Sequence, residues 1–402
     1  MPASTDPSPQ LLEPLLAAIA AELPAAVELR HRLHAEPELA HRETRTSATV
    51  AAALPVAARA VAGTGLLARI GTSAVGDGAV AVRAELDALP VREQTGAPFS
   101  ATGDAMHACG HDVHMAAVVA LARAAHTLGD ALPAPLIALL QPSEEAYPSG
   151  AEQLAVELAG EPPSALVAAH VHPELEWGAV ALDEGAVNAS CDAFAVTLTG
   201  EPTHGAYPHR GSDPVLAVAE LVVALHARAG RRIDPLAPAS LSVGVLDAGS
   251  AENVIPATAE ARGALRAHRD RDRQTLRELV REVAAGVAAA HGVRAEVRID
   301  AGEPALANDA AIASAGRELL DAAGFARADP WRSCGSDDFA FLGSLAPLAM
   351  AFVGLRGAPG FDERPLHHPE LLVPDAAVGA VAQTLACLYL AASASVSRAR
   401  TG

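Results

Sequence analysis

The sequence predicts an α/β protein, with a catalytic domain on a mostly parallel sheet and an inserted ferredoxin-like α+β domain. Two observations lead to this prediction. Apolar strand-like runs alternate with helical segments in the first half of the chain and again near its end, which is typical of a parallel sheet. Between these parts lies a stretch with the element order β-α-β-β-α-β, which is the ferredoxin-like arrangement.

The alternating part is predicted from hydrophobic spacing. Apolar residues at helical intervals indicate helices, and short apolar runs bounded by turn residues indicate buried strands. On this basis we expect helices at 14–33, 45–54, 111–128, 309–323 and 375–392, and strands at 79–85, 136–140, 165–171 and 348–354.

The middle of the chain has a different pattern. We expect strands at 191–199, 240–246, 258–267 and 294–299, and helices at 213–229 and 271–291. A complete unit inside another chain segment is best explained as an insertion, here a lid that also carries the dimer contact. The predicted domains are a first catalytic segment, an inserted lid/dimerisation domain and a second catalytic segment, at 1–187, 188–300 and 301–402. An exposed edge strand and outer helix make the inserted domain a natural homodimer contact.

Composition excludes several classes of function. The formal net charge is -19, which argues against nucleic acid and anionic membrane surfaces as partners. All 29 basic residues are Arg, so a catalytic lysine is excluded. Four scattered cysteines predict no disulfide framework. With no signal peptide and no uninterrupted apolar span visible, we expect no membrane contact and a cytoplasmic location.

Residues 106–114 hold the strongest chemical signal. They contain three His, one Cys and one Asp directly before a predicted helix. Imidazole, thiolate and carboxylate are the groups that borderline-soft divalent metals prefer. A single His here would be explained more simply as part of a polar turn, with Asp112 capping the helix. The density of such groups favours a metal site.

Four further clusters follow predicted strands of the same sheet. In open α/β sheets, active sites form beyond the carboxyl ends of the strands, so these clusters are expected to converge. Each one alone also fits a solvated loop, and the choice within each His pair stays open from the residues alone. The clusters are Glu85 with Asp87, Glu144 with Glu145, His170 with His172, and His367 with His368.

Several ordered motifs then resemble one family, the dinuclear metallo-amidohydrolases related to aminoacylases and carboxypeptidase-type exopeptidases. Its most similar branch contains hippurate hydrolases, N-acyl-amino-acid amidohydrolases and plant indole-acetyl-amino-acid hydrolases. The resemblance covers most of the chain, from Arg32 to the last helix. It rests on Arg32-Leu33-His34 with Pro37-Glu38-Leu39, and on residues 87–90, 107–112, 141–145, 204–209, 253–256 and 335–339.

The resemblance implies a specific site. The ligands of two divalent ions match Cys109 (bridging), His111, Glu145, His170 and His367, with Zn²⁺ or Mn²⁺ expected and Co²⁺ or Ni²⁺ as alternatives. Glu144 matches the catalytic base, and Asp87 matches a carboxylate that orients a ligand. His204, supplied by a second subunit, would stabilise the oxygen of the tetrahedral intermediate. Asn253 would hold the substrate carboxylate, with Arg262 as a further candidate.

The expected function is metal-dependent hydrolysis of the amide bond of N-acyl amino acids or related small amides. The main alternative is a dipeptidase or carboxypeptidase with the same two-metal machinery. A hydrolase using Cys109 as nucleophile would leave the other His and Glu clusters unexplained, and a non-catalytic metal-binding protein would not need Glu144. Two departures from the family, Glu85 in place of Asp and Pro202-Thr203 in place of Gly-Gly, leave the substrate open.

Overall fold

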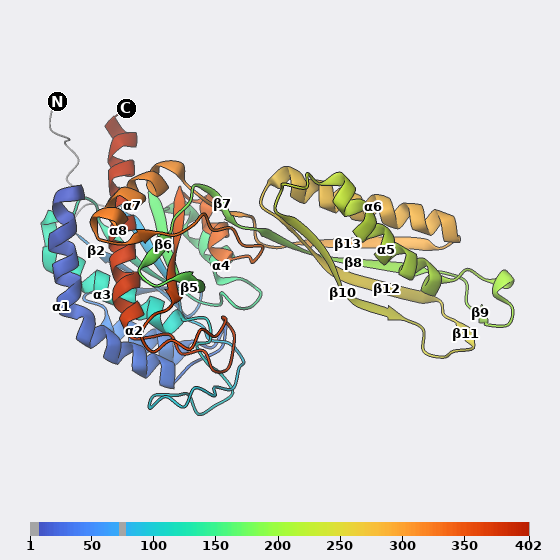
Figure 1. Ribbon diagram of the computed structural model, residues 1–402, viewed down its shortest axis with the longest axis horizontal. Helices are drawn as coiled ribbons and strands as arrows, with labels where there is room; N and C mark the ends of the chain where they lie inside the picture. The colour runs from blue at the N-terminus through green and yellow to red at the C-terminus, as the bar shows by residue number, and fades with distance from the viewer. Residues whose placement is uncertain (1–7, 72–77, 402) are drawn as a thin grey trace. The chain divides into compact units, whose positions relative to one another are not determined.

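The computed structural model describes residues 8–71 and 78–401 of the chain (Figure 1). These residues form two compact units. The first comprises Met1–Gly185, Ala307–Trp331 and Phe341–Gly402, and the second Ala186–Leu306 and Arg332–Ala340. The second unit therefore interrupts the first along the chain. The predicted division at 187/188 and 300/301 into lid and catalytic domains stays a prediction.

The first unit is built on an eight-stranded sheet whose order is β1-β2-β4-β3-β5-β16-β6-β15. The central strands β4, β3, β5 and β16 run parallel, whereas β1 and β2 pair antiparallel at one edge. The fold class predicted for this part is confirmed. The strands are β1 (Arg59–Val61), β2 (Gly65–Ile70), β3 (Val80–Glu85), β4 (Leu136–Gln141), β5 (Ala165–Glu176), β6 (Ala179–Ala181), β15 (Ala326–Arg327) and β16 (Leu348–Arg356).

The central strands explain where a site can form. Every residue of β3 and β4 is buried, as expected for parallel strands covered on both faces. Glu85 at the end of β3 lies opposite Gln141 at the end of β4, so the two strands finish level. The loops that follow β3 and β4 therefore begin at the same edge of the sheet, and β5 and β16 run in the same direction beyond that point.

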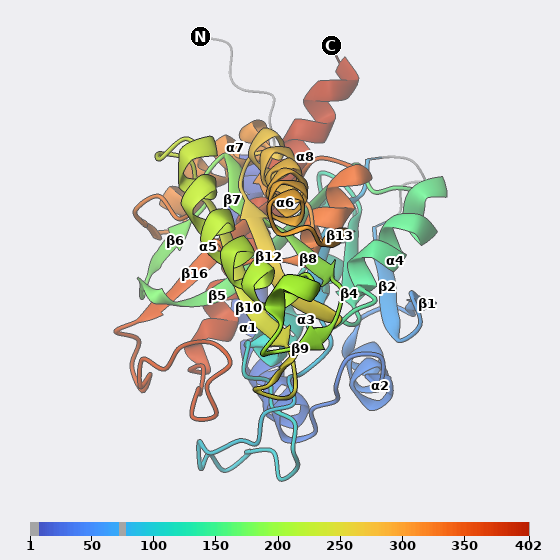
Figure 2. The same ribbon diagram turned by 90° about the vertical axis from the view of Figure 1, so that its right-hand side faces the viewer.

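Helices pack on this sheet and on one another (Figures 1 and 2). They are α1 (Ser8–Ala35), α2 (Thr44–Ala53), α3 (His111–Leu128), α4 (Gly150–Glu157), α7 (Ala310–Ala322) and α8 (Ala376–Thr401). Two helical stretches, Gln10–Ala35 and Ala376–Val396, are long and apolar enough to cross a membrane. The second is largely buried inside the unit, and Leu15 and Ile19 of the first join the same core. Both stretches thus contribute to the packing of the first unit.

The second unit is a four-stranded antiparallel sheet of order β10-β12-β8-β13, with α5 and α6 on one face (Figure 2). Phe194, Val196 and Leu198 alternate along β8 and are buried beneath the helices. The ferredoxin-like part of the predicted fold class is therefore confirmed. Its elements are β8 (Ser190–Thr199), α5 (Pro214–Arg232), β10 (Ala239–Ala248), β12 (Thr258–Ala267), α6 (Asp270–His291) and β13 (Arg294–Ala301).

Two small ribbons complete the strands. β7 (Gly185–Asn188) and β14 (Leu306–Asn308) pair where the chain enters and leaves the second unit. Within the second unit, β9 (Thr203–His204) pairs antiparallel with β11 (Val254–Ile255). The second ribbon brings two segments together that are about fifty residues apart, and both contain predicted substrate-binding residues.

Candidate metal centre

The loop before α3 delivers two of the predicted ligands into the core. His111 is the first residue of α3, and Gly110 before it adopts a φ of 87°. A Cβ at Gly110 would lie 2.6 Å from Cγ2 of Val171, so only glycine allows the backbone to approach β5 this closely. Cys109 and His111 are consequently held against the middle of β5, where His170 lies.

The structure brings the five predicted ligands together. Ligand atoms of Cys109, His111 and Glu145 all lie within 4.8 Å of one another. The Sγ of Cys109 is 3.5 Å from Nε2 of His170, and Nε2 of His367 is 3.5 Å from Oε1 of Glu145. One sulfur, three imidazoles and one carboxylate therefore converge at the carboxyl end of the sheet.

The hydrogen bonds of two of these imidazoles determine which nitrogen can bind a cation. Nδ1 of His111 is 2.8 Å from the Asp87 carbonyl oxygen, and Nδ1 of His170 is 2.7 Å from the Val171 carbonyl oxygen. A carbonyl oxygen only accepts, so Nδ1 must donate in both rings. In the neutral ring, Nε2 then presents its lone pair to the cluster, as required of a metal-binding histidine.

Unpaired polar atoms also indicate a cation. Among the described residues, Nε2 of His111 and Oε1 of Glu145 are buried without a hydrogen-bond partner. Such groups almost always have a partner in a folded protein. Burial, together with the carboxylates of Glu145 and Glu144, raises the pKa of the Cys109 thiol well above its usual range. A divalent cation would favour the thiolate and satisfy these atoms, so the donor set fits a metal centre.

Glu144 and Asp87 lie beside the ligands. Glu144 approaches Nε2 of His111 with its Oε2 at 4.0 Å, and Oε1 of Glu145 lies at the same distance. The backbone N–H of Glu145 donates to Oδ2 of Asp87 across 2.9 Å. Burial raises the pKa of Asp87, which is fully enclosed. Asp87 thus contacts the backbone of Glu145 and, through its own carbonyl, the ring of His111.

The geometry distinguishes the two histidines of each pair as candidate ligands, a choice that the residues alone left open. His172 lies against the Trp331 ring, with 4.1 Å between the ring centroids. His368 accepts the backbone N–H of Glu370 at its Nδ1. His170 and His367, in contrast, approach Cys109 and Glu145 of the cluster.

The remaining predicted residues belong to the second unit. His204 and Asn253 are neighbours there, because Gly205 N–H donates to the Asn253 carbonyl oxygen across 2.8 Å. The N–H of Ala206 donates to Nδ1 of His204, so a neutral His204 carries its proton on the exposed Nε2. Arg262 lies in the middle of β12 opposite Ala195, and its guanidinium pairs with Glu260. The structure thus brings His204 and Asn253 together but not Arg262.

Two buried residues behind the ligands, His114 and Glu85, contact each other, and this contact was not predicted from the sequence. Nδ1 of His114 is 2.9 Å from Oε2 of Glu85, which also pairs with Arg83. Ligand-type atoms of Glu85, His111, His114 and His170 cluster closely enough to hold a cation. However, both nitrogens of His114 already have hydrogen-bond partners, Glu85 and the Val171 N–H. The spacing of His111 and His114, three residues apart on one helix, was the available signal.

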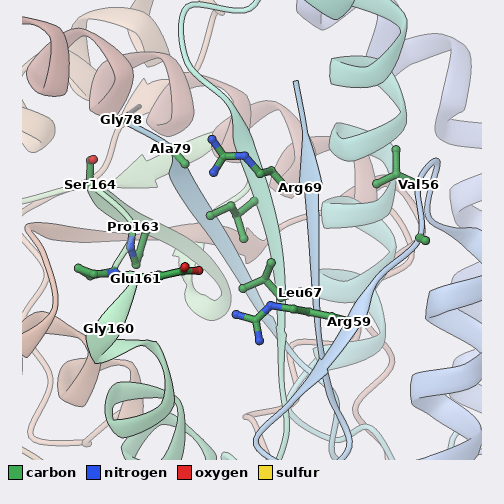
Figure 3. A pocket seen from close by; sticks show the side chains of 13 residues that line it. Val56, Arg59, Leu67, Arg69, Gly78, Ala79, Gly160, Glu161, Pro163 and Ser164 are labelled. Carbon is green, nitrogen blue, oxygen red and sulfur yellow. The ribbon is translucent and has the colours of Figure 1, made fainter. Parts of the chain in front are cut away.

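A cavity of about 530 Å³ lies away from this cluster (Figure 3). Its wall includes Ala79 and Ser164, which precede β3 and β5, and the side chains of Arg59 and Arg69. Of the candidate metal ligands, Cys109 and His111 come after the carboxyl end of β3 and His170 lies within β5, whereas the cavity lies at the amino ends of these strands.

Comparison with known proteins agrees with this chemistry. A profile described as Peptidase family M20/M25/M40 matches residues 81–390. An N-acetyl-L-cysteine deacetylase of Bacillus subtilis is 33% identical over 361 residues, covering 88% of this chain and 84% of that protein. An N-acyl-L-amino acid amidohydrolase of Geobacillus stearothermophilus is 32% identical, covering 68% and 75%.

Solved structures are similar as well. A dinuclear metal-binding peptidase of the M20 family from Bacillus subtilis superposes with a TM-score of 0.81 at 28% identity, covering 92% of this chain and 98% of that one. A Staphylococcus aureus protein described as an aminohydrolase superposes with a TM-score of 0.85 at 26% identity, covering 94% and 98%.

Proposed function

The chain belongs to peptidase family M20/M25/M40, and on that premise we propose that it hydrolyses the amide bond of N-acyl amino acids. Its similarity to proteins named as deacetylase and amidohydrolase identifies it as a metal-dependent amidohydrolase. The substrate class, the residues of the site and the role of Glu144 are the proposal.

One observation carries the proposal most directly. Cys109, His111 and Glu145 converge, and two of their buried atoms have no hydrogen-bond partner among the described residues. We propose these three residues, with His170 and His367, as the ligands of two divalent ions. Zn²⁺ suits the sulfur and imidazole donors, and Mn²⁺, Co²⁺ or Ni²⁺ would bind the same set.

Bound there, such ions supply Lewis acidity that polarises the scissile carbonyl and lowers the pKa of water. Glu144 would accept a proton from the attacking water as its oxygen forms the new C–O bond. The same carboxyl would then give that proton to the amine nitrogen as the C–N bond breaks. Its Oε2 lies 4.0 Å from Nε2 of His111, which supports a role for this carboxylate close to the proposed ligands.

We propose a narrower class of substrates than the family description alone implies. Two relatives carry names with acetyl or acyl amino acids, so N-acetyl amino acids are the first substrates to test. In the second unit, Nε2–H of His204 would donate to the developing oxyanion, and Asn253 would hold the substrate carboxylate. Their adjacency supports a shared task on one substrate. Arg262, which pairs with Glu260, remains a further candidate for binding the substrate carboxylate.

The test is hydrolysis of N-acetyl amino acids, hippurate and dipeptides, with and without EDTA and added metal ions. We expect amino acid release that EDTA abolishes, that divalent metal restores, and that Glu144→Gln lowers by about a hundredfold or more. Glu152→Gln changes an exposed carboxylate just beyond this loop and should leave the rate unchanged. Hydrolysis of dipeptides alone would support the dipeptidase alternative, and a fully active Glu144→Gln would contradict the assigned base.

We also propose that the protein is a homodimer through its second unit, in which His204 of each copy serves the partner's metal centre. Strand β10 is an open edge of its sheet, and Leu246 on it is about half exposed. On α5, Leu216 and Val223 are also largely exposed. Open edges and exposed apolar side chains are typical of surfaces that pair with a second copy.

Light scattering and activity test this assembly together. Val223→Glu should yield a monomer that folds but has lost most of its activity. A monomer with full turnover would contradict the role of His204 across subunits, and dimers that persist would contradict the proposed surface. The cytoplasmic location stays a prediction.

A further inference from the structure

Ser143 has an unusual backbone at the base of the loop that carries Glu144. Its φ is 51°, in the left-handed region that residues other than glycine rarely adopt. The residue is buried and lies between Pro142, the first residue after β4, and Glu144. Strained conformations of this kind persist only where the surrounding structure holds them, and they often lie at functional sites.

The hydrogen bonds that hold Ser143 come from a segment a hundred residues earlier. Ser143 N–H donates to Oε1 of Glu43 across 2.8 Å, and its Oγ lies 3.2 Å from the same oxygen. The Oγ also accepts the backbone N–H of His41 at 2.8 Å. Glu43 is fully buried, and its other oxygen accepts the Thr64 hydroxyl at 2.8 Å. The carboxylate is therefore fixed from both sides.

The far side of the loop is equally constrained. The N–H of Gly150 donates to the carbonyl oxygen of Ser143 across 3.0 Å. A Cβ at Gly150 would lie only 1.7 Å from the Pro142 carbonyl oxygen, so only glycine closes the loop here. Glu145 N–H is bound by Asp87. Glu144 is thus placed by two anchors, Glu43 acting through Ser143 and Asp87 acting through Glu145.

We infer that Glu43 and Ser143 are positioning residues for the reaction. They hold the left-handed turn that directs the Glu144 carboxylate toward the metal centre while Glu145 faces the other proposed ligands. This inference rests on the proposed role of Glu144 as the base. A base held in the productive geometry matters for kcat, because small misplacements of a catalytic group cost large factors in rate.

Substitutions at Ser143 separate positioning from stability. Ser143→Gly removes the backbone strain, since glycine adopts positive φ freely, but it also frees the turn. Ser143→Ala keeps the Cβ and loses only the hydroxyl contacts. We expect the melting temperature of Ser143→Gly to equal or exceed that of Ser143→Ala, while its kcat is about tenfold lower than wild type and lower than that of Ser143→Ala. A purely structural role would make kcat follow the melting temperature instead, and that result would overturn the inference.

Two substitutions at Glu43 form a matched pair of variants. Glu43→Ala removes the acceptor of the Ser143 N–H, and kcat should fall by about tenfold or more with KM and bound metal nearly unchanged. Glu43→Gln keeps an oxygen for Ser143 and a polar group for Thr64, so it should restore most of the rate. Glu36→Gln, at an exposed glutamate directly after α1, is the control. Equal kcat in Glu43→Ala and wild type would overturn the inference.

Amide hydrogen exchange tests the positioning role without any substrate. In Glu43→Ala, the amide of Ser143 should exchange about tenfold faster or more than in wild type, because its acceptor is gone. Unchanged exchange contradicts the positioning role whatever the activity. A wild-type protein that cleaves no N-acyl amino acid would contradict the proposed function instead, and that failure is visible without any variant.

Discussion

The backbone N–H of Val171 donates a hydrogen bond to Nε2 of His114, with 3.1 Å between the two nitrogen atoms. Nε2 of His114 is therefore unprotonated, and Nδ1 carries the proton that points to Glu85, 2.9 Å away. The carbonyl of Val171 in turn accepts from Nδ1 of His170. A buried chain of hydrogen bonds thus runs from Glu85 to the residue that orients a proposed metal ligand.

His114→Asn tests this chain, because asparagine is too short to reach both partners. We expect divalent metal to bind about tenfold to a hundredfold more weakly, as is usual when support behind a ligand is lost. The measurement is competition with a chelating dye. His126→Asn changes an exposed histidine of the same helix and should leave the affinity unchanged. Equal affinity in the two variants would show that His114 does not support the centre.

Metal binding should release a proton from Cys109. Burial and the neighbouring glutamates raise the pKa of this thiol, so it is protonated at neutral pH until a cation arrives. Calorimetry at pH 7 in buffers of different ionisation enthalpy counts the protons released. Cys109→Ser should release fewer protons and bind more weakly, because the hydroxyl retains its proton. Cys334→Ser, at an exposed cysteine, should match wild type, and identical proton counts in all three would exclude a thiolate ligand.

The buried His34 predicts a pH dependence of stability. Burial lowers its pKa, but Asp112 and Glu93 more than offset this and raise the pKa from 6.5 to about 9. The shift corresponds to roughly 3 kcal/mol. A raised pKa means that this stabilisation is complete below pH 6.5 and is lost as the pH rises toward 9.

Urea unfolding of metal-free protein between pH 6 and 9 measures this effect. The free energy of unfolding of wild type should exceed that of His34→Gln at pH 6, and this difference should shrink as the pH rises to 9. For Glu93 the sign is opposite: burial raises its pKa, yet hydrogen bonds from His34 and Thr95 lower it from 4.5 to about 2. Its contribution is present above pH 4.5 and is lost as the pH falls toward 2. A difference between wild type and His34→Gln that stays constant from pH 6 to 9 would contradict the prediction.

The fold was predictable where the pattern is local. β3 and β4 are continuous apolar runs because both their faces are buried, and such runs are recognisable in the sequence. The predicted clusters after these strands converge because parallel strands end at one edge. The strand β2 was not predicted, since Gly65–Ile70 is short and its register depends on Leu66 pairing with Leu140 far along the chain.

The residues that position the site were less predictable from the sequence than its proposed ligands. Residue type and density suggested Cys109 and His111. Composition alone left His170 and His172 open; the family resemblance favoured His170, and in the structure His170 is the one that contacts Cys109. The bond from Ser143 to Glu43 joins residues a hundred positions apart. Nothing in a spacing pattern indicates such a pair, because it depends on how the helix–strand segments pack. The backbone strain at Ser143 is likewise visible only in three dimensions.

Arg30 provides the last prediction. Its guanidinium donates to Asp112 at 2.7 Å, to Asp375 at 2.7 Å and to the Val373 carbonyl oxygen at 2.8 Å. It therefore joins α1, the first turn of α3 and the segment leading into α8. Both Arg30 and Asp112 are almost completely buried. Among the described residues, Arg30→Met would leave the buried Asp112 carboxylate with His34 as its remaining hydrogen-bond partner.

We expect Arg30→Met to lower the free energy of unfolding by about 3–5 kcal/mol, the usual cost of breaking a buried ion pair from one side. Urea titration of metal-free protein measures it, and Arg32→Met, at an exposed arginine of the same helix, should cost under about 0.5 kcal/mol. Removing both charges in Arg30→Met with Asp112→Leu should recover part of the loss, because the penalty comes from the unpaired carboxylate. If the double variant is as unstable as the sum of the two single variants, Arg30 acts through packing rather than through its charge.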